Sequence, residues 1–366
     1  MEPILEEIKV DGYHKVIKVT EPKSGLLGII AIHDMTLGPA VGGIRFRNYS
    51  SFDEALEDVL RLSKGMTYKF AVSPNSYGGG KSVIITDPKT GKNVNLLRAF
   101  GKAIEMLEGD YIGAEDSGCT TKDLDIINKE TSYLIGLQNE KGSGNPAPFT
   151  AWGTFRGIEA SLFKSFGSIS LEGKIVAIQG IGMVGEVLAE HLFWRGAHLI
   201  IADINAEVCK KVAKKFSATI CDPQEILKVH CDVLAPCAFG GIINKETIPS
   251  LNCKILAGCA NNQLLQDSDA DILKEKGILY APDFVINGGG AMSCVNELEP
   301  EGHSSMQSRK MVDHIFENLL EIFDISEKKN ISTLQASKFI AKNRLRQMIE
   351  KNKNLLFPPP ITKVNA

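Results

Sequence analysis

The fold of this chain is indicated by one continuous stretch, Leu171-Glu172-Gly173-Lys174-Ile175-Val176-Ala177-Ile178-Gln179-Gly180-Ile181-Gly182-Met183-Val184-Gly185. Its first part, 171–179, is apolar and β-branched and predicts a strand, and its second part matches the pattern G-x-G-x-x-G. Apolar residues at helical spacing follow, and 198–203 predicts a second strand that ends in an acid. This order is typical of a dinucleotide-binding βαβ unit.

The glycine pattern is predicted to bind NAD. Glycines allow a tight turn and let a pyrophosphate approach the helix N-terminus, whose N–H groups attract anions. Asp203, eighteen residues after Gly185, would accept a hydrogen bond from the adenosine ribose and repel a 2′-phosphate, which favours NAD over NADP. A glycine-rich turn that binds no cofactor is the alternative. The predicted cofactor residues of this unit are Gly180, Gly182, Met183, Val184, Gly185 and Asp203.

The patterns that follow extend this unit into a doubly wound α/β domain. Residues 232–237, 253–258 and 277–282 are short apolar runs that predict further strands of one sheet. Ligands bind beyond the carboxyl ends of such strands, where Asn262 offers a donor and an acceptor that suit the carboxamide of nicotinamide. Turn chemistry is the alternative interpretation of this asparagine. Residues 305–352 are predicted to be helical throughout.

The N-terminal part of the chain predicts a second α/β region. Residues 8–10, 15–19 and 27–33 predict paired strands, and 95–107 predicts a helix. The segment 36–45 contains glycines and a proline, so we expect neither a helix nor a central strand there.

Two further elements place candidate residues in this region. A helix is predicted for 51–63, with Ser51 as its N-cap and Glu54 as the capping-box partner. Residues 111–118 predict a strand that ends in an acidic turn containing Asp116. An ordinary turn aspartate is the alternative interpretation of Asp116.

A domain boundary is predicted at 141–150, which is rich in Gly, Pro, Ser and Asn. We therefore expect an α/β protein of two domains separated by a cleft. The first is an N-terminal substrate domain over 1–140, onto which helices at about 333–357 could pack. The second is a Rossmann-type, doubly wound NAD-binding domain over 147–332.

Two lysines predict a site in the N-terminal domain. Lys69 and Lys81 are twelve residues apart, and Lys81 follows the three glycines 78–80, which leave room for a ligand beside the backbone. Burial and a second ammonium would both favour a neutral amine that takes a proton near neutral pH, while the other lysine binds an anion. Two surface lysines are the alternative. A phosphate-binding loop is excluded, because Asn75 replaces its first glycine and 82–86 predicts a strand.

The bulk composition excludes several classes of protein. The 366 residues suffice for two domains, and a net charge of −3 gives no reason to expect nucleic acid or an anionic membrane as a partner. We find no apolar run of membrane-spanning length and no signal-peptide pattern. The eight cysteines lack metal-ligand spacing, so we expect no metal site, reduced thiols and a cytoplasmic location.

These motifs together resemble the glutamate/leucine/phenylalanine/valine dehydrogenases, and most closely the leucine dehydrogenases. The resemblance extends over about residues 38–298. It rests on the segments Gly38–Arg45, Leu62–Lys69, Gly78–Lys81, Ala114–Asp116, Gly144–Pro146, Gly180–Gly185, Ala260–Gln263 and Pro282–Asn287.

The resemblance implies reversible, NAD-dependent oxidative deamination of an L-amino acid to a 2-oxo acid and ammonia by a homo-oligomer, dimer to octamer. Lys81 would be the general base, Asp116 would shuttle protons to and from the amine, and Lys69 would bind the substrate carboxylate. Thr150 and Asn262 would orient the nicotinamide. The residues implied to line the substrate site are Val41, Gly42, Gly43, Ala114, Ala291 and Cys294.

The lining residues are small and include no lysine for a second carboxylate, which excludes glutamate. We expect a branched-chain substrate, leucine and also isoleucine or valine. Apolar pockets discriminate by only about 1–3 kcal/mol per methylene, so phenylalanine or tryptophan is the alternative. A non-catalytic NAD-binding regulator is a third hypothesis. The sequence departs from the family at Pro74 and Tyr77, which could reshape the pocket.

Overall fold

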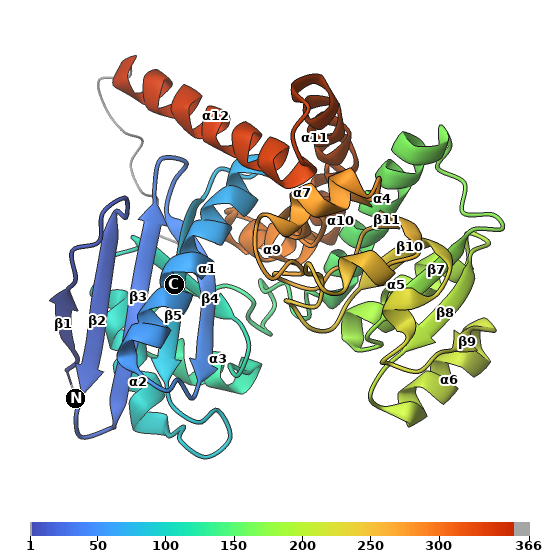
Figure 1. Ribbon diagram of the computed structural model, residues 1–366. Coiled ribbons are helices and arrows are strands. Elements are labelled where there is room, and N and C mark those ends of the chain that lie inside the picture. Colours follow the sequence, from blue (N-terminus) through green and yellow to red (C-terminus); the bar gives the residue numbers. More distant parts are fainter. Residues whose placement is uncertain (1, 355–366) are drawn as a thin grey trace. The chain divides into compact units, whose positions relative to one another are not determined.

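The computed structural model describes residues 2–354 and divides the chain into two compact units (Figure 1). Of the described residues, unit 1 contains those up to Asn145, the segment Cys294–Ser305 and those from Ala341 onward, and unit 2 contains Pro146–Ser293 and Met306–Ile340. Positions 355–357 of the predicted C-terminal packing segment lie outside the described residues. Within the described chain, no helix is long and apolar enough to cross a membrane.

Unit 1 is built on a mixed sheet with the order β1-β2-β3-β5-β4-β6. β4 pairs in parallel with β5 and β6, and the other neighbours are antiparallel. The strands are β1 (Ile4–Glu7), β2 (Lys15–Glu21), β3 (Leu26–Asp34), β4 (Ala40–Arg47), β5 (Gly78–Ile85) and β6 (Tyr111–Glu115).

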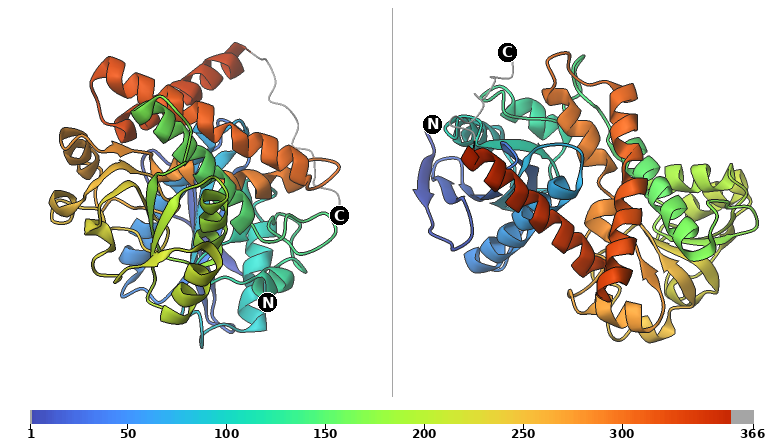
Figure 2. Two further views of the ribbon diagram at one scale, coloured as in Figure 1. Left: turned by 90° about the vertical axis from the view of Figure 1, so that its right-hand side faces the viewer. Right: turned by 90° about the horizontal axis from the view of Figure 1, so that it is seen from above.

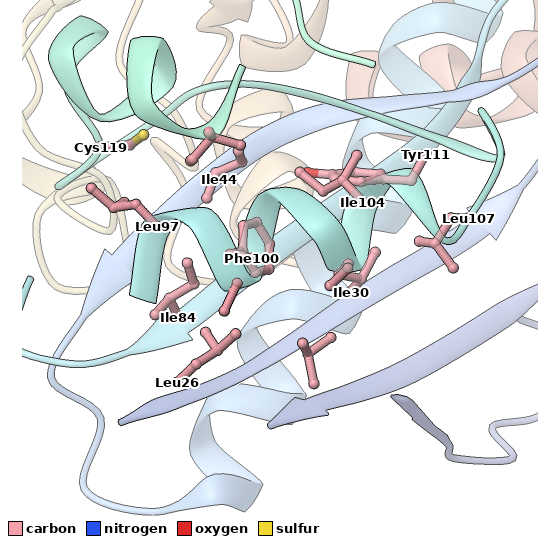
Figure 3. Close-up of a cluster of buried hydrophobic side chains, with 14 of the residues drawn as sticks. Leu26, Ile30, Ile44, Ile84, Leu97, Phe100, Ile104, Leu107, Tyr111 and Cys119 are labelled. Carbon is pink, nitrogen blue, oxygen red and sulfur yellow. The ribbon is translucent and has the colours of Figure 1, made fainter. Parts of the chain in front are cut away.

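Helices cover both faces of this sheet (Figure 2). α1 (Phe52–Val72) packs through Ala55 and Val59 on one face. α2 (Val94–Glu105) and α3 (Thr121–Ile127) cover the other face. Figure 3 shows Phe100 and Ile104 of α2 against side chains of the strands. The apolar spacing that predicted the helix at 95–107 is therefore the face that α2 buries.

Two strand predictions for this unit are wrong. The first strand is β1, and 8–10 instead lead into a turn in which Tyr13 N–H donates to the Val10 carbonyl (3.2 Å). The segment 36–45 supplies β4, a central strand, because glycine permits a close neighbour: a Cβ on Gly42 would lie 1.8 Å from the Gly80 carbonyl oxygen.

The helix predicted for 51–63 continues to Val72, so Lys69 lies in its last turn. Ser51 is its N-cap and accepts the Glu54 N–H at 3.1 Å, as predicted. The Glu54 carboxylate instead accepts the N–H of Ser50 (2.8 Å), so the predicted capping box is only half formed.

Unit 2 contains a six-stranded sheet, all parallel, with the order β12-β11-β10-β7-β8-β9. Counted from β7 and starting at the β9 edge, this is the order 3-2-1-4-5-6 of a doubly wound dinucleotide-binding fold. The predicted fold class is confirmed. The strands are β7 (Ile175–Gln179), β8 (His198–Ala202), β9 (Thr219–Ile220), β10 (Cys231–Pro236), β11 (Cys253–Leu256) and β12 (Leu279–Tyr280).

The segment 305–352, predicted to be helical throughout, contains three helices, which are interrupted at His314 and at 330–332, where Asn330 has φ 53°. The remaining helices are α4 (Ala147–Phe166), α5 (Met183–Phe193), α6 (Ala206–Phe216), α7 (Asp269–Glu275), α8 (Asp283–Ile286), α9 (Gly289–Val295), α10 (Ser305–Asp313), α11 (Ile315–Lys329) and α12 (Thr333–Asn354).

Candidate active site

Lys81 and Asp116 meet in unit 1. Lys81 lies in β5, and Asp116 directly follows β6; both strands pair with β4. The Lys81 Nζ lies 3.1 Å from Asp116 Oδ2, and only 6% of Lys81 is exposed to solvent. Register within the parallel part of the sheet therefore brings together two residues that are 35 positions apart in the sequence.

Arg45 is a third charged member of this site that the sequence analysis did not assign. Its Nε donates to Asp116 Oδ2 (2.9 Å), and its Nη1 donates to Asp58 Oδ2 (3.0 Å). Burial raises the pKa of Asp116, but the charges of Lys81 and Arg45 outweigh that effect and leave the pKa lowered. Asp116 is thus held as a carboxylate. Arg45 is part of the quoted segment Gly38–Arg45, but its contacts with Asp116 and Asp58 depend on the tertiary structure and could not be predicted from the sequence.

Gly43 makes the contact between Lys81 and Asp116 possible. A Cβ at this position would lie 2.6 Å from Asp116 Cβ and 3.0 Å from Lys81 Nζ. Gly79 and Gly80 were predicted to leave room for a ligand, but protein atoms fill the space beside both. A Cβ on Gly79 would lie 2.1 Å from the backbone nitrogen of Thr67 in α1, and one on Gly80 would lie 2.8 Å from the Tyr111 ring. These two glycines accommodate other parts of the protein, so the prediction that they leave room for a ligand is wrong.

The other predicted substrate residues lie in both units. Lys69 is half-buried in the last turn of α1. Val41 is buried in β4, and Ala114 is half-buried in β6. Cys294 is also in unit 1, where the Ser143 hydroxyl donates to its Sγ (3.5 Å), and burial raises the pKa of its thiol to about 12. Ala291 belongs to unit 2.

Neither residue that departs from the family lies in a regular element. Pro74 follows Ser73, the C-cap of α1, and Tyr77 precedes β5. The Tyr77 ring centroid lies 5.9 Å from that of Phe70. Burial raises the pKa of Tyr77 to about 12.

The glycine pattern in unit 2 forms the tight turn between β7 and α5. Gly180 has φ +98°, and a Cβ there would lie 2.6 Å from Ala238 Cβ. A Cβ on Gly185 would lie 2.1 Å from the Gly180 carbonyl, so this glycine packs the start of α5 against β7. Gly182 differs, because no described atom outside its chain neighbours lies within 4 Å of the corresponding position. Open space therefore remains where a pyrophosphate would approach α5. Met183 and Val184 lie in the first turn of α5.

Asp203 is positioned at the same edge of the sheet, directly after β8. Its Oδ2 accepts the N–H of Ile181 (2.7 Å), within the glycine pattern, and its Oδ1 accepts the N–H of Asn205 (2.8 Å). The carboxylate is thereby held in a fixed orientation with lone pairs left over for a diol. This arrangement suits the ribose of NAD and disfavours a 2′-phosphate.

The predicted nicotinamide residues also lie in unit 2. Asn262 follows β11, is exposed and has φ +51°. Thr150 lies in the first turn of α4, where its hydroxyl donates to the Pro146 carbonyl (3.2 Å). Asn287 ends the quoted segment Pro282–Asn287. Its Nδ2 donates to Asn261 Oδ1 (2.7 Å), while its buried Oδ1 has no partner among the described residues. An unpaired buried acceptor is suited to a ligand donor such as an amide.

The matches to known proteins cover nearly the whole chain. Residues 14–134 match the model of the Glu/Leu/Phe/Val dehydrogenase dimerisation domain, and 201–352 match that of the glutamate/leucine/phenylalanine/valine dehydrogenases. A leucine dehydrogenase of Geobacillus stearothermophilus is 49% identical over 92% of this chain and 91% of that protein. A phenylalanine dehydrogenase of Lysinibacillus sphaericus is 43% identical over 90% and 87%. The crystal structure of L-tryptophan dehydrogenase from Nostoc punctiforme superposes with a TM-score of 0.83, at 39% identity over 93% and 97% of the two chains.

Proposed function

Because the chain belongs to the glutamate/leucine/phenylalanine/valine dehydrogenase family and is an amino acid dehydrogenase, we propose that it deaminates a branched-chain L-amino acid oxidatively, with NAD as the hydride acceptor. Leucine is the first expected substrate, followed by isoleucine and valine. The products are the 2-oxo acid and ammonia, and the reaction is reversible. The observation that carries the proposal is the buried contact between Lys81 and Asp116.

The chain's residues have complementary tasks in this reaction. Lys69 binds the substrate carboxylate, and Asp116 takes a proton from the substrate ammonium. Gly182 and Asp203 would hold NAD, which would supply the acceptor for the hydride of the α-carbon. Lys81 then takes a proton from the water that attacks the resulting imine, which gives the 2-oxo acid after ammonia leaves.

The contact between Lys81 and Asp116 explains how the lysine becomes a base. In the structure, Lys81 is the ammonium of an ion pair with Asp116. Its proton must leave before it can accept one from water, and Asp116 is within reach to take it after the proton received from the substrate ammonium has passed to solvent.

An aromatic L-amino acid is the second candidate substrate. Relatives that act on phenylalanine and tryptophan support it, as do the small side chains at Val41, Ala114 and Cys294. We also propose a homo-oligomer, dimer to octamer, because the N-terminal match is to a dimerisation domain. Location in the cytoplasm stays a prediction.

The test is formation of NADH from a panel of L-amino acids, measured by absorbance for the wild type and Lys81→Ala. We expect activity on leucine, isoleucine or valine, and a loss of at least about 100-fold in the variant, the range of general-base catalysis. Lys92→Ala is the matched control, since Lys92 is another shielded lysine of unit 1, paired with Asp123 at 2.5 Å. A preference for phenylalanine or tryptophan would change the proposed substrate. The absence of NADH formation from every amino acid tested would refute the proposed function.

A further inference from the structure

We propose that Arg45 is a positioning residue for Asp116, and that Asp58 limits how strongly Arg45 acts on that carboxylate. Neither Arg45 nor Asp58 touches the reacting atoms in the mechanism above. The inference rests on the proposed function, because it assigns these residues to the proton transfer by Asp116.

The four charged side chains alternate in sign along one line of contacts. Lys81 Nζ is 3.1 Å from Asp116, Asp116 is 2.9 Å from Arg45 Nε, and Arg45 Nη1 is 3.0 Å from Asp58. Their exposed side-chain fractions are all between 8% and 18%, so water screens these charges weakly. At the end of the line, the hydroxyl of Tyr49 donates to Asp58 Oδ2 (2.7 Å), and Nη2 of the exposed Arg61 lies 3.7 Å from Asp58 Oδ1.

The contacts of Arg45 favour a role in orientation. A guanidinium can donate from two nitrogens at fixed angles, whereas the ammonium of a lysine is a single point charge. Arg45 uses one nitrogen for Asp116 and another for Asp58, which fixes the Asp116 carboxylate relative to α1. Both Arg45 and Lys81 contact Oδ2 of Asp116. Oδ1 is therefore the oxygen left to exchange a proton with a substrate amine.

The balance of charge explains why Asp58 is present. Two cations next to one carboxylate would hold Asp116 so firmly as an anion that it would be a poor proton acceptor. The negative charge of Asp58 offsets that of Arg45 and restores part of the basicity of Asp116. The titratable and charged groups around Asp116 are Lys81 from β5, Arg45 from β4, Tyr111 and Glu115 from β6, and Cys119 from the turn that follows.

Two neutralising variants should shift Asp116 in opposite directions. Arg45→Gln removes a cation, so the pKa of Asp116 should rise by about one unit or more, a tenfold change in proton affinity. Asp58→Asn removes the negative charge that opposes Arg45, so the pKa of Asp116 should fall. This fall should be smaller than the rise in Arg45→Gln, because Asp58 is farther from Asp116 than Arg45 is. The acidic limb of kcat/KM should move to higher pH in the first variant and to lower pH in the second.

The chain offers an exposed copy of the same arrangement as a control. Arg47 lies two residues after Arg45 in β4, and Glu54 lies one helical turn before Asp58 in α1; the two side chains are 3.4 Å apart. Arg47→Gln and Glu54→Gln should leave the titration of Asp116 and the pH profile unchanged. The double variant Arg45→Gln/Asp58→Asn removes one positive and one negative charge. Its Asp116 pKa and pH profile should therefore lie close to those of the wild type, even where Arg45→Gln alone folds poorly.

The experiment is an NMR titration of isotopically labelled aspartate side chains, assigned with Asp116→Asn, together with pH profiles of kcat/KM. Opposite shifts in the two variants support the inference. Shifts in the same direction, no shift, or equal shifts in the control pair overturn it. The NMR titration needs no substrate, so an enzyme that is inactive on every amino acid would refute the proposed function while the carboxylate titration still decides this inference.

Discussion

Gly43 lies in β4 at the point where Lys81 approaches Asp116. An alanine there would place a Cβ 2.6 Å from Asp116 Cβ and 3.0 Å from Lys81 Nζ, so the carboxylate must move. A displacement of about 1 Å at a reacting group can cost about 100-fold in rate. We therefore expect Gly43→Ala to lower kcat/KM by about 100-fold and to destabilise the protein by about 1–3 kcal/mol through overpacking. Steady-state kinetics and urea unfolding measure the two effects.

Gly65→Ala is the matched control for this substitution. Gly65 lies within α1, and no described atom outside its own helix lies within 4 Å of its potential Cβ. Alanine is favoured over glycine in a helix by about 0.5–1 kcal/mol, so this variant should be slightly more stable and fully active. Full activity of Gly43→Ala would show that the Lys81–Asp116 geometry is not required.

The individual residues of the site differ in how well the sequence predicts them. Lys81 and Asp116 stand in recognisable motifs, so both could be proposed without coordinates. Arg45 and Asp58 could not be assigned as partners, because their contacts depend on the register of β4 against β6 and on the rotation of α1 over the sheet. The same limit applies to Gly79 and Gly80, since glycine marks a close approach without saying whether a ligand or the protein itself approaches.

The charged line also connects elements of unit 1. Asp116 follows β6, and its partners Lys81 and Arg45 belong to β5 and β4. The pKa of folded Asp116 is lowered, so its contribution to stability is fully present above the unfolded value of about 3.9 and is lost as pH falls through the folded value. We expect the free energy of unfolding, measured with urea between about pH 2 and 7, to fall more steeply in acid for the wild type than for Asp116→Asn.

Glu57→Gln provides the comparison for this acid effect. Glu57 is an exposed carboxylate of α1 and has no part in the charged line. Its variant should keep the acid dependence of the wild type. An Asp116→Asn protein with an unchanged acid dependence would mean that the ion pairs of Asp116 contribute nothing to holding these strands together.

Whole elements were predicted well where local pattern and tertiary packing agree. The apolar spacing of α2 and the alternation of β2 and β3 correspond to buried faces. β4 was missed, because its glycines disfavour a strand locally while pairing on both sides stabilises one. α1 was predicted too short, because the polar residues Ser63 and Thr67 stand on its buried face between Val59 and Phe70 and interrupt the apolar spacing.

The division into two units gives a direct test of where NAD binds. The chain has two tryptophans, Trp152 and Trp194, and both lie in unit 2. Tryptophan fluorescence therefore follows the unfolding of the unit that contains the glycine pattern. A ligand that binds only the folded state at 100 times its Kd adds about 2.7 kcal/mol to the free energy of unfolding. We expect NAD to raise the urea midpoint of the fluorescence transition accordingly, and NADP to raise it less because of Asp203.

Gly182→Ala makes this test specific to the pyrophosphate. Gly182 has φ −79°, which alanine adopts freely, and its potential Cβ meets no described atom within 4 Å. The variant should therefore unfold like the wild type without NAD. With NAD it should gain much less stability, since the added methyl group occupies the space through which the pyrophosphate reaches the N-terminus of α5. Equal stabilisation of both proteins would place the pyrophosphate elsewhere. A variant already destabilised without NAD would show that the space beside Gly182 is filled by the protein.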